Sequence, residues 1–330
     1  MIPPLDEILG TARVVALPLH TRFRGVDVRE ALLLRGPEGW AEFSPFVEYD
    51  DAEASAWLAA ALADAWEPRP APVRDAVPVN ATVPAVEAAR VAEVLARYDG
   101  CRTAKVKVAE RGQTLADDVA RVSAVRAAMG PEGRIRIDAN GGWNVDEAER
   151  AVHALAGFDL EYAEQPCASV PELAELRERI AYLGIPIAAD ESVRKATDPL
   201  AVARAGAADL LVVKAQPLGG IRRALEIVAE AGLPAVVSSA LDTAVGLSTG
   251  AALAAALPAL DYDCGLGTAS LFVDDVADAR PRNGEIGIGR VVPDPDALDR
   301  LAAAPERRDW WLDRLRRCHG MLAAEDARTA

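Results

Sequence analysis

The sequence has 330 residues, of which 51% are hydrophobic, and its 36 Lys and Arg against 51 Asp and Glu give a formal net charge of −15. This length suits a barrel of about 250 residues with one additional domain. The acidic balance argues against nucleic acid or an anionic membrane as a partner. No apolar run reaches the roughly 18 residues that span a bilayer, and no signal peptide or obligate protein partner is indicated. The four scattered cysteines, without a CxxC pair, indicate reduced thiols and a cytoplasmic protein.

Residues 1–75 are expected to form an α+β domain of their own. Short alternating apolar runs predict strands, an alanine-rich stretch predicts a helix, and a proline-rich stretch predicts a linker. The predicted strands are Val14–Leu19, Glu30–Arg35 and Trp40–Ser44, the helix is Asp51–Ala65, and the linker covers residues 67–72.

Residues 76–267 repeat a strand-like apolar run at regular intervals. Each interval leaves room for one amphipathic helix and two turns, so the pattern predicts parallel βαβ units. Eight such units are typical of a (β/α) barrel, and a doubly wound open sheet is the alternative. Residues 268–330 depart from this period, and their amphipathic end is expected to return to the first domain. The predicted strands are Val77–Thr82, Ala104–Val108, Arg134–Ala139, Leu160–Glu164, Ile185–Asp190, Asp209–Lys214, Ala235–Ser239 and Leu260–Cys264.

Charged side chains stand at the ends of five consecutive predicted strands. Active sites of (β/α) barrels lie at the carboxyl ends of the strands, and a charge at the end of an apolar strand is costly unless it is paired or used. We therefore expect an active site there. The charged residues are Lys105, Lys107, Asp138, Glu164, Asp190, Glu191 and Lys214.

Asp138, Glu164 and Asp190 are expected to converge on one point. Carboxylate oxygens without His or Cys nearby favour Mg²⁺, with Mn²⁺ as an alternative. Lys107 and Lys214 stand on strands four apart in an eight-stranded ring, so they would face each other across the mouth. A metal on a substrate carboxylate stabilises the enediolate formed by α-proton removal, and a lysine of lowered pKa is a suitable base. The arrangement predicts proton abstraction from a small anionic carboxylate.

Four further residues are candidates for substrate contact. Arg136 shares the face of Asp138, and it is either a substrate ligand or an ion-pair partner within the barrel. Ser238 and Ser239 end the seventh predicted strand, and Arg24 lies in a basic stretch of the first domain.

The ordered motifs resemble the enolase superfamily. They are Lys105-x-Lys107, Asp138-x-Asn140, Glu164-Gln-Pro, Asp190-Glu191 and a strand-6 lysine, Lys214. The paired lysines are similar to the muconate-lactonizing subgroup. This resemblance implies a (β/α)7β modified TIM barrel over residues 76–267, an α+β capping domain over residues 1–75, and a C-terminal segment, 268–330, that returns to the capping domain.

Within that subgroup, Arg136–Asn140, the Ser238-Ser239 pair and Cys264–Thr268 resemble o-succinylbenzoate synthases of the actinobacterial kind. The resemblance implies a lyase of menaquinone biosynthesis that dehydrates 2-succinyl-6-hydroxy-2,4-cyclohexadiene-1-carboxylate in the syn sense. It implies that Lys107 removes the proton and that Lys214 stays protonated to stabilise the enediolate. Lys105, Asn140 and Glu191 would then act as outer ligands or supporting residues.

Two other functions stay open at this point. Asp261 and Asp263 resemble the Asp-x-Asp with which dipeptide epimerases hold a substrate ammonium, so an epimerase or an N-acylamino acid racemase is an alternative. A non-catalytic barrel that binds metal for stability is a remote one, because two lysines beside a purely structural cation would be unfavourable.

Overall fold

Alternating apolar residues near the N-terminus form an antiparallel sheet that lies between two hydrophobic cores. In the computed structural model, which describes residues 2–195 and 198–329, this sheet has the order β1-β2-β3. Successive side chains of a strand point to opposite faces. Leu32 and Leu34 accordingly pack into one core, whereas Ala31 and Leu33 pack into the other. The strands are β1 (Arg13–Phe23), β2 (Val26–Gly36) and β3 (Gly39–Phe43).

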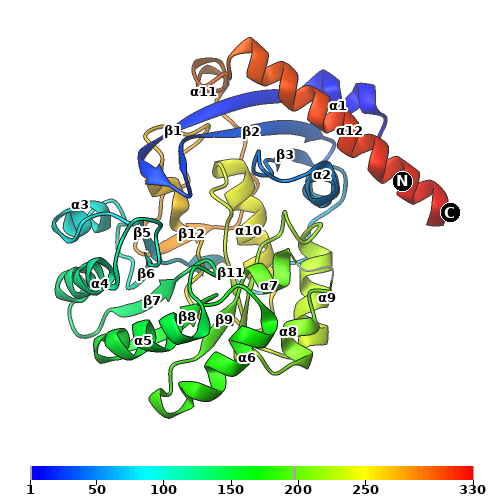
Figure 1. The fold of residues 1–330 in the computed structure, drawn as a ribbon. Helices are drawn as coiled ribbons and strands as arrows, with labels where there is room; N and C mark the ends of the chain where they lie inside the picture. Colours follow the sequence, from blue (N-terminus) through cyan, green and yellow to red (C-terminus); the bar gives the residue numbers. More distant parts are fainter. Residues whose placement is uncertain (1, 196–197, 330) are drawn as a thin grey trace.

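Three helices cover the outer face of this sheet. α2 (Asp51–Trp66) begins at Asp50, whose carboxylate accepts a hydrogen bond from the backbone amide of Glu53 at 2.8 Å. The C-terminal helix α12 (Pro305–Thr329) packs along α2 and also contacts α1 (Leu5–Thr11). Figure 1 shows α12 running over the capping sheet beside α1 and α2. The boundaries that the sequence suggests after residues 75 and 267 stay predictions.

A curled parallel sheet forms the second core, and it confirms the predicted (β/α)7β barrel. Its hydrogen-bonded order is β11-β10-β9-β8-β7-β6-β5, so strands adjacent in the chain are adjacent in space. Most side chains of these strands are buried, as expected for a sheet that is covered on both faces, although three of the strands carry charged residues among the apolar ones. They are β5 (Ala81–Val83), β6 (Thr103–Lys107), β7 (Arg134–Asp138), β8 (Leu160–Glu164), β9 (Ile187–Ala189), β10 (Leu210–Val213) and β11 (Ala235–Val237).

The first and eighth predicted strands are less regular than the sequence suggests. The predicted run Val77–Thr82 is divided, because β4 (Ala76–Pro78) pairs with β12 (Glu285–Gly287) outside the barrel, and only β5 joins the barrel sheet. The eighth run closes the ring through two isolated bridges, Val79 with Cys264 and Ser238 with Gly265. A few hydrogen bonds are enough to close a barrel at one strand. The apolar run in the sequence therefore does not show how many of its residues pair with a neighbouring strand.

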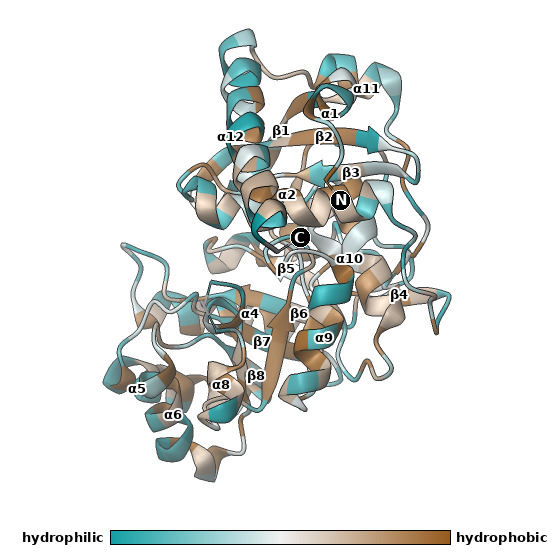
Figure 2. Ribbon diagram, turned by 90° about the vertical axis from the view of Figure 1, so that its right-hand side faces the viewer, coloured by the Kyte–Doolittle hydropathy of each residue, from teal (hydrophilic) through white to brown (hydrophobic). Residues whose placement is uncertain are grey.

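Helices cover the outside of the barrel, with polar faces toward solvent (Figure 2). Three of them, α4, α5 and α6, begin with capping boxes, which satisfy the free amides of a first turn. Among the described residues, no helix is both long and apolar enough to cross a membrane. The helices that cover the barrel are α3 (Val91–Leu95), α4 (Leu115–Met129), α5 (Val145–Leu155), α6 (Val170–Arg179), α7 (Glu191–Arg194), α8 (Ala201–Arg204) and α9 (Ile221–Ala231), with 3-10 turns η1 (Ala88–Arg90), η2 (Ala156–Phe158), η3 (Ala181–Leu183) and η4 (Gly267–Leu271). By contrast, α10 (Ala244–Ala256) is almost wholly buried, and α11 (Pro295–Arg300) lies beside the capping sheet (Figure 1).

Candidate active site

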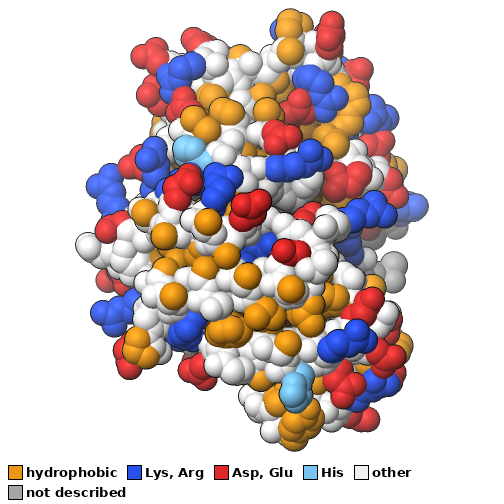
Figure 3. Space-filling model, turned by 60° about the vertical axis from the view of Figure 1, so that its left-hand side comes forward, with side chains coloured by type: hydrophobic (Ala, Val, Ile, Leu, Met, Phe, Trp, Pro, Cys, Tyr) orange, Lys and Arg blue, Asp and Glu red, His pale blue; other side chains and the backbone are white. Residues whose placement is uncertain are grey.

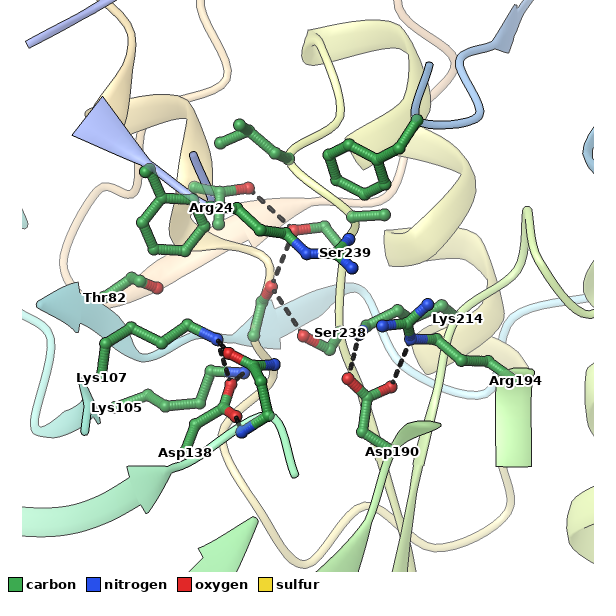
Figure 4. Close-up of a pocket in the computed structure, with 17 residues that line it drawn as sticks. Arg24, Thr82, Lys105, Lys107, Asp138, Asp190, Arg194, Lys214, Ser238 and Ser239 are labelled. Carbon is green, nitrogen blue, oxygen red and sulfur yellow. Dashed lines mark hydrogen bonds and ion pairs between the residues drawn. The ribbon is translucent and has the colours of Figure 1, made fainter. Parts of the chain in front are cut away.

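A small pocket lies where the carboxyl ends of the barrel strands meet the capping domain. Most of the residues that the sequence singles out line it, and Figure 4 shows them converging from separate strands. Capping-sheet residues Phe23 and Phe46 form part of the wall. The predicted residues in the lining are Arg24, Lys105, Lys107, Asp138, Asn140, Asp190, Lys214, Ser238 and Ser239.

The lining is basic although the molecule is acidic. Five cationic side chains face the pocket against two carboxylates, which gives 5 − 2 = +3. Figure 3 shows acidic and basic side chains interspersed over one outer face, so the positive charge is a local property of the pocket. An anionic small molecule is therefore the ligand that this pocket favours. The cations are Arg24, Lys105, Lys107, Arg194 and Lys214.

On one side of the pocket, Lys105 joins two buried carboxylates. Its Nζ lies 2.9 Å from Glu164 Oε1 and 3.2 Å from Asp138 Oδ2. Burial lowers the pKa of Lys105, but Glu164 and Asp138 outweigh burial and hold that pKa above its usual value. Burial also raises the pKa of Asp138, yet Lys107 and Lys105 bring it well below its usual value. Lys105 thus forms ion pairs with both carboxylates.

Lys107 reaches further into the pocket than Lys105. Its Nζ donates to Asp138 Oδ2 and to Asn140 Oδ1, and it lies 5.5 Å from the centre of the Phe23 ring. Asn140 Nδ2 in turn donates to Glu191 Oε1 at 3.2 Å. The predicted group of Lys107, Asn140 and Glu191 is therefore brought together by direct hydrogen bonds.

On the opposite side, Lys214 and Arg194 hold the third carboxylate. Lys214 Nζ lies 2.5 Å from Asp190 Oδ2, and Arg194 Nε lies 3.0 Å from Asp190 Oδ1. Burial lowers the pKa of Lys214, against the opposing effect of Asp190. Burial raises the pKa of Asp190, but Lys214 and Arg194 outweigh it and bring that pKa to about 2. Figure 4 shows Lys107 and Lys214 on opposite sides of the pocket, as predicted from the ring of strands.

Of the three buried carboxylates, Glu164 is the one whose negative charge is least compensated by its neighbours. Its Oε2 atom is buried without a hydrogen-bond partner. Burial, and then the nearby charge of Asp138, raise the pKa of Glu164 to about 7. Among residues 2–195 and 198–329, no three acidic, His or Cys side chains lie close enough to form a preformed metal site, because ammonium groups pair with the carboxylates. The donor set and the unpaired oxygen nevertheless fit a hard divalent cation, which would neutralise the buried charge.

Gln165 explains why a glutamine follows Glu164. Its backbone is in the left-handed region with φ of 38°, a conformation that is strained for any residue other than glycine. Its Oε1 accepts the backbone amides of Asp190 at 3.0 Å and Ser192 at 3.1 Å, while its Nε2 donates to Ser192 Oγ at 2.7 Å. The strained glutamine therefore fixes the start of α7, where Asp190 stands.

The serine pair lies against the closing end of the barrel. Ser239 Oγ donates to the Gly265 carbonyl at 3.1 Å and lies 2.8 Å from Thr268 Oγ1. A Cβ at Gly265 would stand 2.4 Å from Ser238 Oγ, so only glycine permits this approach. Both hydroxyls line the pocket.

Arg136 does not reach the pocket. Its guanidinium is fully buried and donates to Glu161 Oε2 at 2.9 Å, Tyr162 Oη at 2.9 Å and the Asp263 carbonyl at 2.7 Å. This placement fits the ion-pair alternative and removes Arg136 from the charges that face a substrate. Arg136 points into the barrel on the same face of β7 as Asp138, but it stands two residues earlier and so lies one layer of side chains below the pocket.

Asp263 also lies at the other end of the barrel. Its carboxylate accepts from Thr103 Oγ1 and Arg134 Nη2, both at 2.6 Å, and these residues begin β6 and β7. A carboxylate at the amino ends of the strands does not face the pocket. Gly265 lines the pocket, so Asp261 and Asp263, which precede it on the same run, lie deeper in the barrel. The expectation that they hold a substrate ammonium is therefore wrong.

The structure adds two polar pocket residues that sequence reasoning missed. Thr82 is the middle residue of β5, and its buried Oγ1 has no hydrogen-bond partner. Arg194 lies on the first turn after Asp190 and Glu191, and it contacts both. Arg194 stands four residues after Asp190 and three after Glu191, a helical spacing at which side chains meet, and this spacing could have identified it from the sequence.

Two family models match the chain. Residues 14–65 match the enolase N-terminal domain-like model, and residues 87–290 match the enolase C-terminal domain-like model. Muconate lactonizing enzyme from Pseudomonas fluorescens superimposes with a TM-score of 0.74 at 21% identity, over 89% of this chain and 98% of that one. The fold and the lysines and carboxylates at the strand ends define a barrel enzyme of the enolase superfamily.

Curated relatives narrow this class. The chain is 58% identical to o-succinylbenzoate synthase of Mycolicibacterium smegmatis, over 97% of this chain and 99% of that protein. It is 56% identical to o-succinylbenzoate synthase of Mycobacterium tuberculosis, over 98% of each. The chain belongs to the o-succinylbenzoate synthase family of the enolase superfamily.

Proposed function

We propose that the protein dehydrates 2-succinyl-6-hydroxy-2,4-cyclohexadiene-1-carboxylate to o-succinylbenzoate, in the cytoplasm and as a step toward menaquinone. The observation that carries this proposal is the pair Lys107 and Lys214 on opposite sides of a basic pocket. The substrate is a small anion with two carboxylates, which suits that charge. Relatives of 56–58% identity over nearly the whole chain bear the corresponding name.

The proposal includes one divalent cation, Mg²⁺ with Mn²⁺ as an alternative. Asp138, Glu164 and Asp190 would hold it, because all three are buried and the charges of Asp138 and Asp190 both raise the pKa of Glu164. When bound, such a cation supplies positive charge to the oxygens of the substrate carboxylate, which makes the adjacent C–H more acidic. Lys105 would keep Asp138 and Glu164 in place, and Asn140 and Glu191 would support them from outside.

Lys107 and Lys214 would divide the proton chemistry. Syn-dehydration removes a proton and a hydroxyl from the same face, so one group first accepts the proton and then returns it to the departing oxygen. Lys107 is suited to this task, because it ends β6, lines the pocket and contacts Asn140. Lys214 would keep its proton and stabilise negative charge from the opposite face. Burial lowers its pKa, and the ion pair with Asp190 opposes that effect.

N-acylamino acid racemisation is the second candidate, and one observation favours it. Two amines on opposite faces of one pocket are what a two-base racemase needs. The position of Asp263 at the far end of the barrel removes the feature that favoured a dipeptide epimerase.

The test is an assay of the purified protein with Mg²⁺ against the cyclohexadiene substrate, N-succinyl amino acids and dipeptides. We expect efficient dehydration of the first compound. Turnover of N-succinyl amino acids without dehydration would reverse the order of the two candidates. No turnover of any compound would overturn the proposed function.

A further inference from the structure

A tyrosine of the capping domain lies just behind the pocket and joins its two guanidinium groups. Tyr49 follows β3, and its hydroxyl accepts a hydrogen bond from Arg24 Nη2 and another from Arg194 Nη1, both at 3.0 Å. Arg24 belongs to the turn between β1 and β2, whereas Arg194 belongs to α7 of the barrel. Tyr49 does not line the pocket, but both arginines do. One oxygen thus ties a capping-domain cation to a barrel cation.

The surroundings of Arg24 point to a missing anion. Its guanidinium carbon lies 4.0 Å from the centre of the Phe46 ring, and the guanidinium carbon of Arg29 lies 4.4 Å from the same centre. Within the described part of the chain, no acidic side chain makes an ion pair with Arg24, whereas Arg194 is paired with Asp190 and Glu191. The charges of Glu42 and Asp242 act on Arg29, so Arg24 is the cation of this pair that an anion in the pocket would balance. The pocket is the open side of this group.

Tyr49 is held firmly enough to orient other groups. Its side chain is buried, and its ring lies 5.6 Å from Phe46 and 6.1 Å from Trp57 between ring centres. The buried guanidinium of Arg314, from α12, donates to the backbone carbonyls of Phe46, at 3.0 Å, and Tyr49. The loop is therefore fixed from both sides, and the hydroxyl has a defined position.

We propose that Tyr49 is a positioning residue that turns Arg24 and Arg194 toward the second carboxylate of the substrate, the one remote from the carbon that loses its proton. This inference rests on the proposed function for the identity of that dicarboxylate. Guanidinium groups bind carboxylates through paired, directional hydrogen bonds, so their orientation matters as much as their charge. Loss of the shared acceptor removes one orienting hydrogen bond from each guanidinium while both charges remain.

The experiment compares Tyr49→Phe with Tyr182→Phe, a control at an exposed tyrosine, in the full-length protein loaded with Mg²⁺. Calorimetry measures the binding of o-succinylbenzoate and of 2-butyrylbenzoate, which has a methyl group in place of the remote carboxylate. We expect Tyr49→Phe to weaken the first ligand about tenfold, as expected for a lost hydrogen bond to a charged group, and to leave the second unchanged. The control should bind both ligands as the wild type does.

Equal weakening of both ligands, or no weakening of either, would overturn the inference, since a merely structural tyrosine does not distinguish them. In turnover, the same variant should raise KM more than it lowers kcat, and Arg24→Ala should do likewise. Succinate serves as a probe that does not depend on the proposed reaction. If the wild type fails to dehydrate the cyclohexadiene but Tyr49→Phe still weakens succinate binding, the proposed function fails and the inference stands. Succinate binding that ignores the hydroxyl would count against the inference.

Discussion

Three lysines of one type acquire different properties from their immediate neighbours. Lys105 lies between two carboxylates, and its pKa is raised by them. Lys214 has a pKa that burial lowers, with one carboxylate opposing. Lys107 contacts one carboxylate and one amide oxygen, and it borders the pocket beneath Phe23. We propose on the basis of these surroundings that Lys105 is a fixed cation, Lys214 an electrostatic stabiliser and Lys107 the base.

Replacement of Lys107 by alanine tests this assignment. We expect Lys107→Ala to lose at least about a thousandfold in kcat, because general acid–base groups contribute roughly that much and here one group acts twice. Lys214→Arg keeps its positive charge but is no longer a usable base, so it should retain part of the dehydration and lose all racemisation. Exchange of the α-proton for deuterium in each enantiomer of an N-succinyl amino acid measures both effects. Normal dehydration by Lys107→Ala would place the base on β10 instead.

Removal of divalent metal is the second test at this scale. The unpaired Oε2 of Glu164, and a pKa raised to about 7 by burial and by Asp138, show that the carboxylates lack part of their neutralising charge. Excess EDTA should abolish turnover, and Mg²⁺ or Mn²⁺ should restore it. Glu164→Gln should weaken Mg²⁺ binding, which calorimetry measures without turnover, whereas the exposed Glu48→Gln should not. Full activity in EDTA would remove the metal from the mechanism.

At the scale of elements, the period of apolar runs is the part of the fold that the sequence predicts best. The strands are mainly apolar apart from a few charged residues, and the helices between them have one apolar and one polar face, so the repeat of strand and helix can be recognised from the sequence alone. The division of the first strand, and the two bridges of the eighth, depend on pairing partners far away in the chain, which the period does not contain. For the same reason Asp263 had the right spacing but the wrong end of the barrel.

The site shows the same limit. Residues such as Asp138 and Lys214 follow directly from their place at strand ends. Tyr49 and Arg194 are 145 residues apart in the chain and meet where the capping domain contacts the barrel. No local pattern in the sequence indicates this contact. Site residues that end single strands can be predicted from the sequence. Contacts between the capping domain and the barrel can be found only in the folded structure.

One such contact is the N-terminus of α10, which is capped by a residue of the capping sheet. Glu42 Oε2 accepts the backbone amides of Thr243 at 3.0 Å and Gly246 at 3.1 Å, as well as the hydroxyl of Thr243. Glu42→Ala should lower the free energy of unfolding by about 2–4 kcal/mol, because several buried donors lose their acceptor. Denaturant unfolding measures this loss, with the exposed Glu48→Ala as the matched control. Equal stabilities for the two variants would show that water replaces the carboxylate at no cost.

At the scale of the whole molecule, the C-terminal helix α12 packs back onto the N-terminal capping domain (Figure 1). The capping sheet has two buried faces, and one of them is covered by α2 and α12 rather than by the barrel. Trp311 is fully buried there, its ring lies 5.9 Å from that of Phe43, and its Nε1 donates to Glu30 Oε2 at 2.9 Å. The same helix carries Arg314, which holds the loop of Tyr49. Stability of the cap and the shape of the pocket therefore depend on one helix.

Trp311→Ala should lower the free energy of unfolding by about 3–5 kcal/mol, the usual cost of removing a large aromatic side chain from a core. Met321→Ala, on the exposed side of the same helix, should change it by less than about 0.5 kcal/mol. Because α12 also holds the loop of Tyr49, the folded fraction of Trp311→Ala should show a raised KM for the cyclohexadiene, with a smaller change in kcat. Denaturant unfolding and steady-state kinetics at a temperature well below the transition measure the two effects separately. A large loss of stability with an unchanged KM would mean that α12 supports the capping sheet but leaves the position of Arg24 to the barrel alone.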